Sequence, residues 1–102
     1  MKGRNPTKRE KEWISAVCNI GCIVCAVCED CPDVPCSPHH INGRTKTGSH
    51  LEVIGLCHAH HQADDNNPSY DSVHGSKYRF EKRYGTQKKL LEITKKIIGW
   101  DG

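Results

Sequence analysis

Cysteine and histidine crowd into the middle of this chain, and their spacing limits the folds it can adopt more than any other feature. The 102 residues include seven cysteines and seven histidines. Six of the cysteines lie between positions 22 and 57, and all the histidines lie between positions 39 and 74. A chain of this length buries only about 60–65 % of its unfolded surface, and 35 % of the residues are hydrophobic. Such small cores commonly need disulfides or a structural metal ion.

The cysteine pattern favours metal over disulfides. The cysteine count is odd, and the opening residues MKGRNPTKREKEW contain no apolar core of a signal peptide. No stretch approaches the roughly 18 apolar residues of a membrane span. We therefore expect a cytoplasmic protein whose thiols stay reduced, and there clustered CxxC spacings indicate metal.

Local signals indicate one α+β domain. Thr7 and Glu10 have the spacing of a capping box, and two short apolar stretches favour strands. The cysteine- and proline-rich segment 22–36 is expected to lack regular structure. The expected elements are a helix at about 8–19, a strand that starts at His39-His40-Ile41, a glycine-rich loop at 42–48, a strand at 53–56, a helix that begins within 57–63, a loop at 64–76, a helix at about 77–84 and a last helix between Thr86 and Gly99.

Two knuckles have the spacing of a structural zinc site. Cys22-x-x-Cys25 should lie on a turn, and Cys57-x-x-His60 should begin a helix. When a hairpin brings such pairs together, they form a closed tetrahedral site that stabilises the fold and does not react. A rival local set has equally plausible spacing and would form a second structural zinc site: Cys28, Cys31, Cys36 and His39.

The remaining histidines occur in an order that could form a second, reactive metal site. His39 and His40 are adjacent at the expected strand, and His61 follows the second knuckle by one position. Adjacent strand residues point to opposite sides, so one imidazole can bind a metal ion while its neighbour faces a substrate. Phosphodiester cleavage needs a base that activates water and a divalent ion at the phosphate and leaving oxygen.

Four blocks together resemble a known family. GCIVC, PHHINGR, SHLEVIGLCHAHHQ and VHGSKYRFEKRYGTQ occur in this order. They look like the phage recombination-enhancement, RecA-dependent nuclease family of the HNH (ββα-metal) superfamily, over about Lys11 to Leu91. The resemblance implies a small zinc-stabilised ββα-metal core with an N-terminal helix and C-terminal helices. With the local signals, we expect a single nuclease domain, 1–102, with a flexible lead at 1–6, a metal-binding core at 22–74 and C-terminal helices at 77–99.

The resemblance also implies roles for individual histidines. His40 would be the general base, and His50 would orient either that base or the scissile phosphate. His39 and His61 would bind a catalytic Mg²⁺ or Mn²⁺, in a site that Zn²⁺ can also occupy. The third ligand has two candidates. Asp65 lies one helical turn beyond His61, whereas the family pattern favours His74, which we prefer.

Positive charge is concentrated near both ends of the chain. The net charge is only +3, and the segment between positions 18 and 71 contains just Arg44 and Lys46 as basic residues. We expect Arg44, Lys46, Lys77 and Arg79 to contact the DNA backbone without reading its sequence.

The expected function is metal-dependent DNA endonuclease activity, with the host RecA filament as a partner, in the bacterial cytoplasm if the chain is phage-encoded. Two other hypotheses are a non-catalytic zinc-ribbon module that binds nucleic acid or protein, and an inactive accessory factor that contacts a recombinase.

Overall fold

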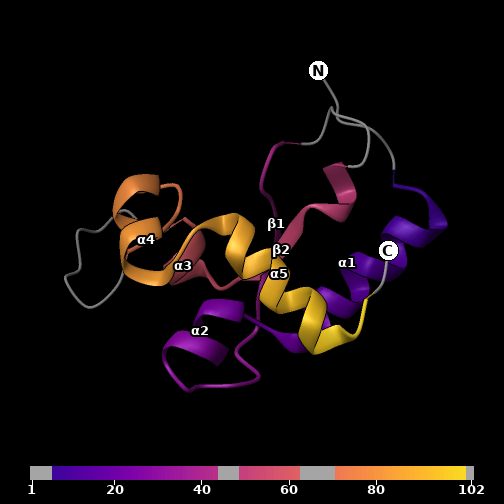
Figure 1. Ribbon diagram of the computed structural model, residues 1–102, viewed down its shortest axis with the longest axis horizontal. Helices are drawn as coiled ribbons and strands as arrows, with labels where there is room; N and C mark the ends of the chain where they lie inside the picture. Colours follow the sequence, from indigo (N-terminus) through magenta and orange to yellow (C-terminus); the bar gives the residue numbers. More distant parts are fainter. Residues whose placement is uncertain (1–5, 44–48, 63–70, 101–102) are drawn as a thin grey trace.

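A two-stranded antiparallel sheet surrounded by helices gives this chain an α+β fold (Figure 1). The computed structural model describes residues 6–43, 49–62 and 71–100. None of the described helices is long and apolar enough to cross a membrane. The elements are α1 (Lys8–Ile20), α2 (Ile23–Cys28), β1 (Ser37–His40), the 3-10 helix η1 (Ser49–Leu51), β2 (Val53–Leu56), α3 (His58–His61), α4 (Lys77–Tyr84) and α5 (Gln87–Ile98).

The first helix begins and ends as the sequence predicts. The Thr7 hydroxyl accepts a hydrogen bond from the backbone N–H of Glu10 at 3.2 Å, and the Glu10 carboxylate accepts one from the Thr7 N–H at 2.7 Å. This reciprocal capping box satisfies two amides that the helix leaves unpaired. Gly21 ends the helix with a φ of 89°. A Cβ there would lie 2.5 Å from the Val34 carbonyl oxygen, so only glycine fits.

The strand β2 lies at the centre of the molecule. Its four residues are all buried, and the strand contacts β1, α1, α2, α3 and α5. His39 pairs with Ile54 and His40 with Val53 in the antiparallel register. The prediction that the strand starts at His39-His40-Ile41 is therefore wrong. The two histidines end β1, because pairing already begins where Ser37 lies opposite Leu56.

The expectation of irregular structure across 22–36 is also wrong in its first part. Residues Ile23–Cys28 form the helix α2, with Ile23, Val24 and Cys25 buried. The run IVCAVC contains neither glycine nor proline, and burial of its apolar side chains outweighs the weak helix propensity of valine and isoleucine. The prolines at positions 32 and 35 come after this helix ends.

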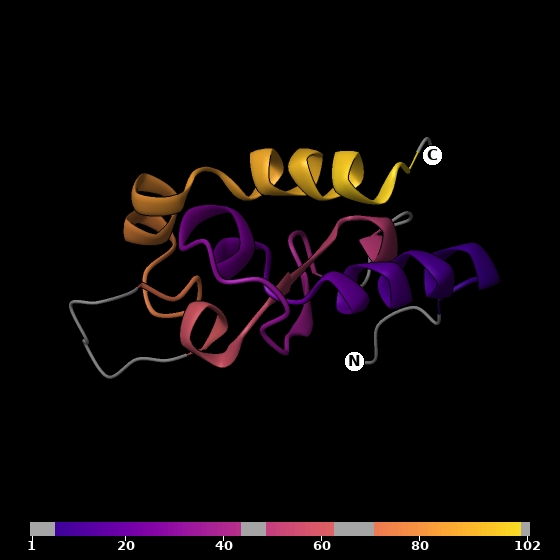
Figure 2. The same ribbon diagram turned by 90° about the horizontal axis from the view of Figure 1, so that it is seen from below.

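The two C-terminal helices agree with their prediction. Ser76 caps α4 by accepting from the Arg79 N–H at 3.2 Å, and Thr86 caps α5 by accepting from the Lys89 N–H at 3.1 Å. The helix α5 runs past the sheet (Figure 2) and buries Leu90 and Leu91 in the core. The first residue of α5, Gln87, lies beside β1, with its side-chain Oε1 2.7 Å from His39 Nε2.

Two candidate metal centres and a histidine pair

Three cysteines and one histidine converge between α2 and α3. Cys22 and Cys57 are the residues before these two helices, whereas Cys25 and His60 lie within them. Cys25 Sγ lies 3.8 Å from Cys57 Sγ, and the three sulfurs lie 3.2–3.6 Å from His60 Nδ1. All four ligand atoms lie within 4.8 Å of one another, so this group could hold a metal ion. We call it the thiol cluster.

A close approach of the backbone brings the two knuckles together. A Cβ on Gly55 of β2 would lie 2.8 Å from the Gly21 carbonyl oxygen and 2.7 Å from Cys36 Sγ. Only a residue without a side chain lets β2 approach the turn before α2 this closely. Since Cys22 follows Gly21, and Cys57 lies two positions beyond Gly55, this contact places both cysteines in one site.

Burial controls the charge state of the thiol cluster. It raises the pKa of Cys22 and, with the neighbouring thiols, raises the pKa of Cys25 well above the ordinary value. Burial also lowers the pKa of His60, and the Glu29 carboxylate opposes this by lying 3.4 Å from His60 Nε2. The imidazole thus has Nδ1 directed to the sulfurs and Nε2 directed to a carboxylate, which is the usual outer partner of a metal-bound histidine.

The rival zinc set does not assemble. Cys28 and Cys31 are exposed, and the Cys28 thiol lies 3.8 Å from the carbonyl oxygen of Tyr84. Cys36 lies 4.0 Å from the carbonyl oxygen of Cys18, and burial raises its pKa to about 12. His39 belongs to a different group. Among the described residues these four side chains form no site, so the predicted second structural zinc site is wrong.

Three histidines form a second group, which we call the histidine cluster. One ring nitrogen each of His39, His61 and His74 lies within 4.8 Å of the others. The ring centroids are 4.8–5.4 Å apart. His39 is buried, His61 half-buried and His74 exposed, so this group reaches the surface and could hold a metal ion with positions open to solvent.

Two backbone hydrogen bonds bring His74 to this cluster. The Val73 N–H donates to the His60 carbonyl at 2.9 Å, and the His74 N–H donates to the His61 carbonyl at 3.1 Å. The segment after the 63–70 stretch therefore runs back along α3. The competing ligand Asp65 lies outside the described residues, so the choice between it and His74 stays a prediction that this convergence supports.

Two histidines of the cluster have an outer partner on one ring nitrogen. His39 Nε2 lies 2.7 Å from Gln87 Oε1 of α5, and His61 Nδ1 lies 3.2 Å from the Ser37 hydroxyl of β1. Burial lowers the pKa of His39, and burial together with the neighbouring histidines lowers the pKa of His61 to about 4. Near neutral pH both rings are uncharged and able to bind a cation. The sequence analysis missed Ser37 and Gln87, because nothing in their local spacing indicates these contacts.

His40 and His50 form a separate pair on the other side of β1. His40 Nε2 lies 2.9 Å from His50 Nδ1, and the rings meet edge to face at 4.9 Å between centroids. His50 is buried in η1, whereas His40 is half-buried. His39 and His40 are adjacent in β1 and contact different partners, because successive side chains of a strand point to opposite faces.

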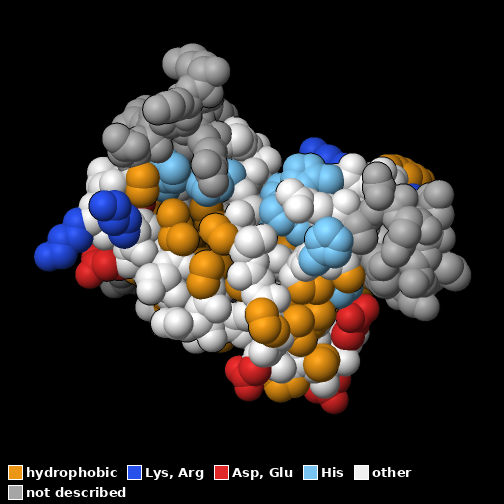
Figure 3. Space-filling view, turned by 180° about the vertical axis from the view of Figure 1, so that it is seen from behind, with side chains coloured by type: hydrophobic (Ala, Val, Ile, Leu, Met, Phe, Trp, Pro, Cys, Tyr) orange, Lys and Arg blue, Asp and Glu red, His pale blue; other side chains and the backbone are white. Residues whose placement is uncertain are grey.

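The structure describes two of the four residues that are expected to contact DNA. Arg44 and Lys46 lie outside the described residues. Lys77 is exposed at the start of α4. Arg79 is 62 % exposed but pairs with the Asp71 carboxylate at 3.3 Å, which partly neutralises its charge. Figure 3 shows histidine side chains gathered on one face of the molecule, with lysine and arginine at its edges.

Comparison with known proteins identifies the family of this chain. A family model described as recombination enhancement, RecA-dependent nuclease matches residues 6–98, most of the chain. No curated protein matches the chain.

Proposed function

Because the chain belongs to the family of recombination enhancement, RecA-dependent nucleases, we propose that it is an HNH-type, metal-dependent endonuclease that hydrolyses DNA phosphodiester bonds. The observation that carries this proposal is the convergence of His39, His61 and His74 beside the His40–His50 pair. The succession β1, β2, α3 has the order of a ββα-metal core, with histidines on its first strand and on its helix. We propose that the whole chain forms one such domain in the bacterial cytoplasm.

In this proposal the thiol cluster holds a structural zinc ion. Zinc–sulfur bonds of about 2.3 Å and zinc–nitrogen bonds of about 2.0–2.1 Å, at tetrahedral angles, separate two sulfurs by about 3.8 Å and a sulfur from a nitrogen by about 3.5 Å. The observed 3.8 Å between Cys25 and Cys57, and 3.2–3.6 Å from the sulfurs to His60, fit these separations. Four protein ligands fill a tetrahedral site, so this ion would stabilise the fold and not react.

The histidine cluster would hold the catalytic ion. Three protein ligands are the number typical of a reactive site, because a coordination position then remains for water or substrate. The sequence-based expectation is Mg²⁺ or Mn²⁺, in a site that Zn²⁺ can also occupy. Three imidazole ligands favour Mn²⁺ or Zn²⁺ over Mg²⁺, which prefers oxygen ligands. A divalent ion here would polarise the phosphate and stabilise the leaving 3′-oxygen.

His40 would take the proton from the attacking water. A base needs a nitrogen with an available lone pair, and its other nitrogen must then carry the proton. If His40 Nε2 donates to His50 Nδ1 across 2.9 Å, His40 Nδ1 becomes the proton acceptor. His50 would thus orient the base and stabilise the imidazolium that forms when His40 accepts the proton.

The family description also supports a recombination role and a partner. We propose that RecA filaments present the DNA, and that Lys77 and Arg79 at α4 hold its backbone. Arg44 and Lys46 would extend this contact.

The test is a cleavage assay on single-stranded and supercoiled DNA, each with and without RecA filaments. The dialysed protein should cleave only after a divalent ion is added back, and His61→Ala should need far more ion than wild type. His58→Ala, which changes an exposed neighbour on the same helix, is the matched control and should behave as wild type. DNA binding without cleavage under every condition would favour the zinc-ribbon binding module instead.

A further inference from the structure

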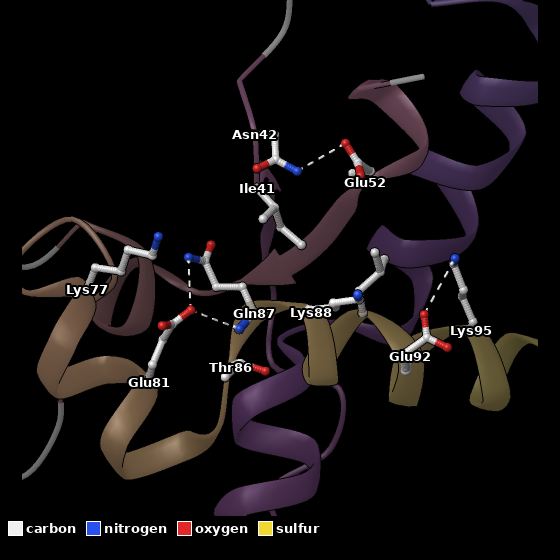
Figure 4. A pocket seen from close by; sticks show the side chains of 11 residues that line it. Ile41, Asn42, Glu52, Lys77, Glu81, Thr86, Gln87, Lys88, Glu92 and Lys95 are labelled. Carbon is white, nitrogen blue, oxygen red and sulfur yellow. Dashed lines mark hydrogen bonds and ion pairs between the residues drawn. The ribbon is translucent and has the colours of Figure 1, made fainter. Parts of the chain in front are cut away.

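A chain of hydrogen bonds leads from the histidine cluster to the wall of a nearby pocket. The pocket has a volume of about 450 Å³ and lies between the turn after β1 and the helices α4 and α5. Gln87 and Glu81 form part of its wall and point toward one another (Figure 4). On its other side, the Gln87 side chain contacts His39 of the cluster.

The Glu81 carboxylate fixes the orientation of the Gln87 amide. Glu81 Oε2 lies 3.1 Å from the backbone nitrogen of Gln87 and 3.5 Å from its side-chain Nε2. A carboxylate only accepts hydrogen bonds, so the amide nitrogen must face Glu81. The amide oxygen then faces His39 Nε2, at 2.7 Å.

The amide oxygen in turn determines which nitrogen of His39 carries the proton. An amide oxygen is an acceptor only, so His39 must place its proton on Nε2 and keep the lone pair on Nδ1. A metal-bound histidine commonly donates its second N–H to such an outer partner, which fixes the tautomer and the direction of the ring.

We propose that Gln87, held by Glu81, is a positioning residue that presents Nδ1 of His39 to the ion of the histidine cluster. This inference rests on the proposed function, since it gives that ion its ligand atom. Gln87 is only 3 % exposed, so the 2.7 Å bond is shielded from competing water. His61 has the weaker counterpart, because its 3.2 Å contact with Ser37 is exposed.

The direct test measures Mn²⁺ binding by electron paramagnetic resonance on full-length protein that retains its tightly bound zinc. Gln87→Met keeps a buried side chain of similar size but removes the acceptor, and it should weaken Mn²⁺ binding about 10–100-fold. Ser37→Ala should weaken binding less. Cleavage by Gln87→Met should recover to the wild-type maximum at high Mn²⁺, since the reacting groups are unchanged.

A reciprocal exchange separates positioning from simple packing. The double variant Glu81→Gln/Gln87→Glu exchanges the positions of the amide and the carboxylate. The carboxylate at position 87 would still accept a hydrogen bond from His39, and the amide at position 81 would still donate a hydrogen bond to that carboxylate. We expect this double variant to bind Mn²⁺ within a few-fold of wild type, whereas Gln87→Met does not. If the exchange fails to restore binding although the fold and zinc content are retained, the hydrogen-bond account is wrong.

Nitrogen NMR of the histidine rings tests the inference without the exchangeable ion. Wild type should show the His39 proton on Nε2, and Gln87→Met should show a mixture of tautomers. Wild type that binds no exchangeable Mn²⁺ would overturn the proposed function. If wild type binds Mn²⁺ and Gln87→Met has the same Mn²⁺ affinity and the same His39 tautomer, the inference about Gln87 is wrong, but the proposed function is not affected.

Discussion

The thiol cluster and the histidine cluster draw on adjacent residues of one short helix yet differ in nearly every physical property. His60 and His61 are neighbours on α3, and successive helical residues point about 100° apart. His60 turns inward, is 2 % exposed and meets three sulfurs. His61 turns outward toward His39 and His74, where the site reaches the surface.

Because of this difference, one helix could contribute to both a structural and a reactive site. A buried set of four ligands encloses its ion, so the free energy of binding contributes to folding. A half-exposed set of three imidazoles leaves room for water and substrate.

The largest effect should come from the thiol cluster. Cys25→Ala removes one of four ligands, and structural zinc in small domains contributes about 10–16 kcal/mol, which matches or exceeds the total stability of a typical domain. We expect Cys25→Ala to lose its cooperative thermal transition, followed by circular dichroism, together with its zinc. His61→Ala should keep both. A melting curve of Cys25→Ala that overlays the wild-type curve would contradict a structural role for the cluster.

The next effect should appear in catalysis alone. His40→Ala removes the proposed base, and loss of a positioned base costs about 10²–10⁴ in rate. Its zinc content, melting temperature and Mn²⁺ affinity should stay at wild-type values, because His40 belongs to neither cluster. The measurement is the single-turnover cleavage rate at saturating ion, with His58→Ala as the control. Equal rates for His40→Ala and wild type would remove His40 from the mechanism.

Proton release should distinguish the two clusters at neutral pH. Because burial raises the pKa of Cys22 and Cys25, these thiols must lose protons before they bind an ion, so affinity of the thiol cluster should rise with pH. The pKa of His61 is lowered to about 4, below the ordinary 6.5. His61 is therefore uncharged above about pH 5, so its titration should not change the affinity of the histidine cluster at neutral pH.

Calorimetry in buffers of different ionisation enthalpy measures this release. We expect at least two protons per zinc at the thiol cluster, from Cys22 and Cys25, and none from His61 per Mn²⁺ at the histidine cluster. Release of more protons at the histidine cluster than at the thiol cluster would contradict this contrast between the two sites.

The smallest effect should come from the basic residues beside the histidine cluster. Each phosphate contact contributes about −0.9 to the slope of log affinity against log salt on duplex DNA. Lys77→Ala should reduce the slope by about this amount. Arg79→Ala should reduce it less, because Asp71 already pairs with Arg79. A slope unchanged in both variants would show that α4 does not contact the backbone.

The elements with local determinants could be predicted from the sequence. The capping box of Thr7 and Glu10, the start of the last helix at Thr86, and the three-residue knuckle spacings each depend on neighbours within a single turn. Errors arose where pairing between distant segments decides the outcome. The start of β1 depends on its register with β2, and composition alone suggested irregular structure where α2 buries its apolar face.

The candidate site also has one part that depends on local spacing and another that depends on contacts between distant segments. The thiol cluster could be predicted because both halves have a recognisable spacing. The role of Gln87 could not, because 48 positions separate it from His39 and only the packing of α5 brings them together. His74 depended on the family pattern, since its approach to His61 rests on backbone hydrogen bonds that no spacing rule describes.

We propose that one centre keeps its ion for folding while the other exchanges its ion for catalysis. Native mass spectrometry of wild type during a Mn²⁺ titration, with DNA cleavage assayed on the same samples in the presence of RecA filaments, tests it most directly. We expect one zinc per chain after dialysis and no cleavage. A second ion should then bind, with cleavage rising in proportion to its occupancy while the zinc remains. Full cleavage by the form that contains one zinc alone, or displacement of that zinc as cleavage appears, would contradict it.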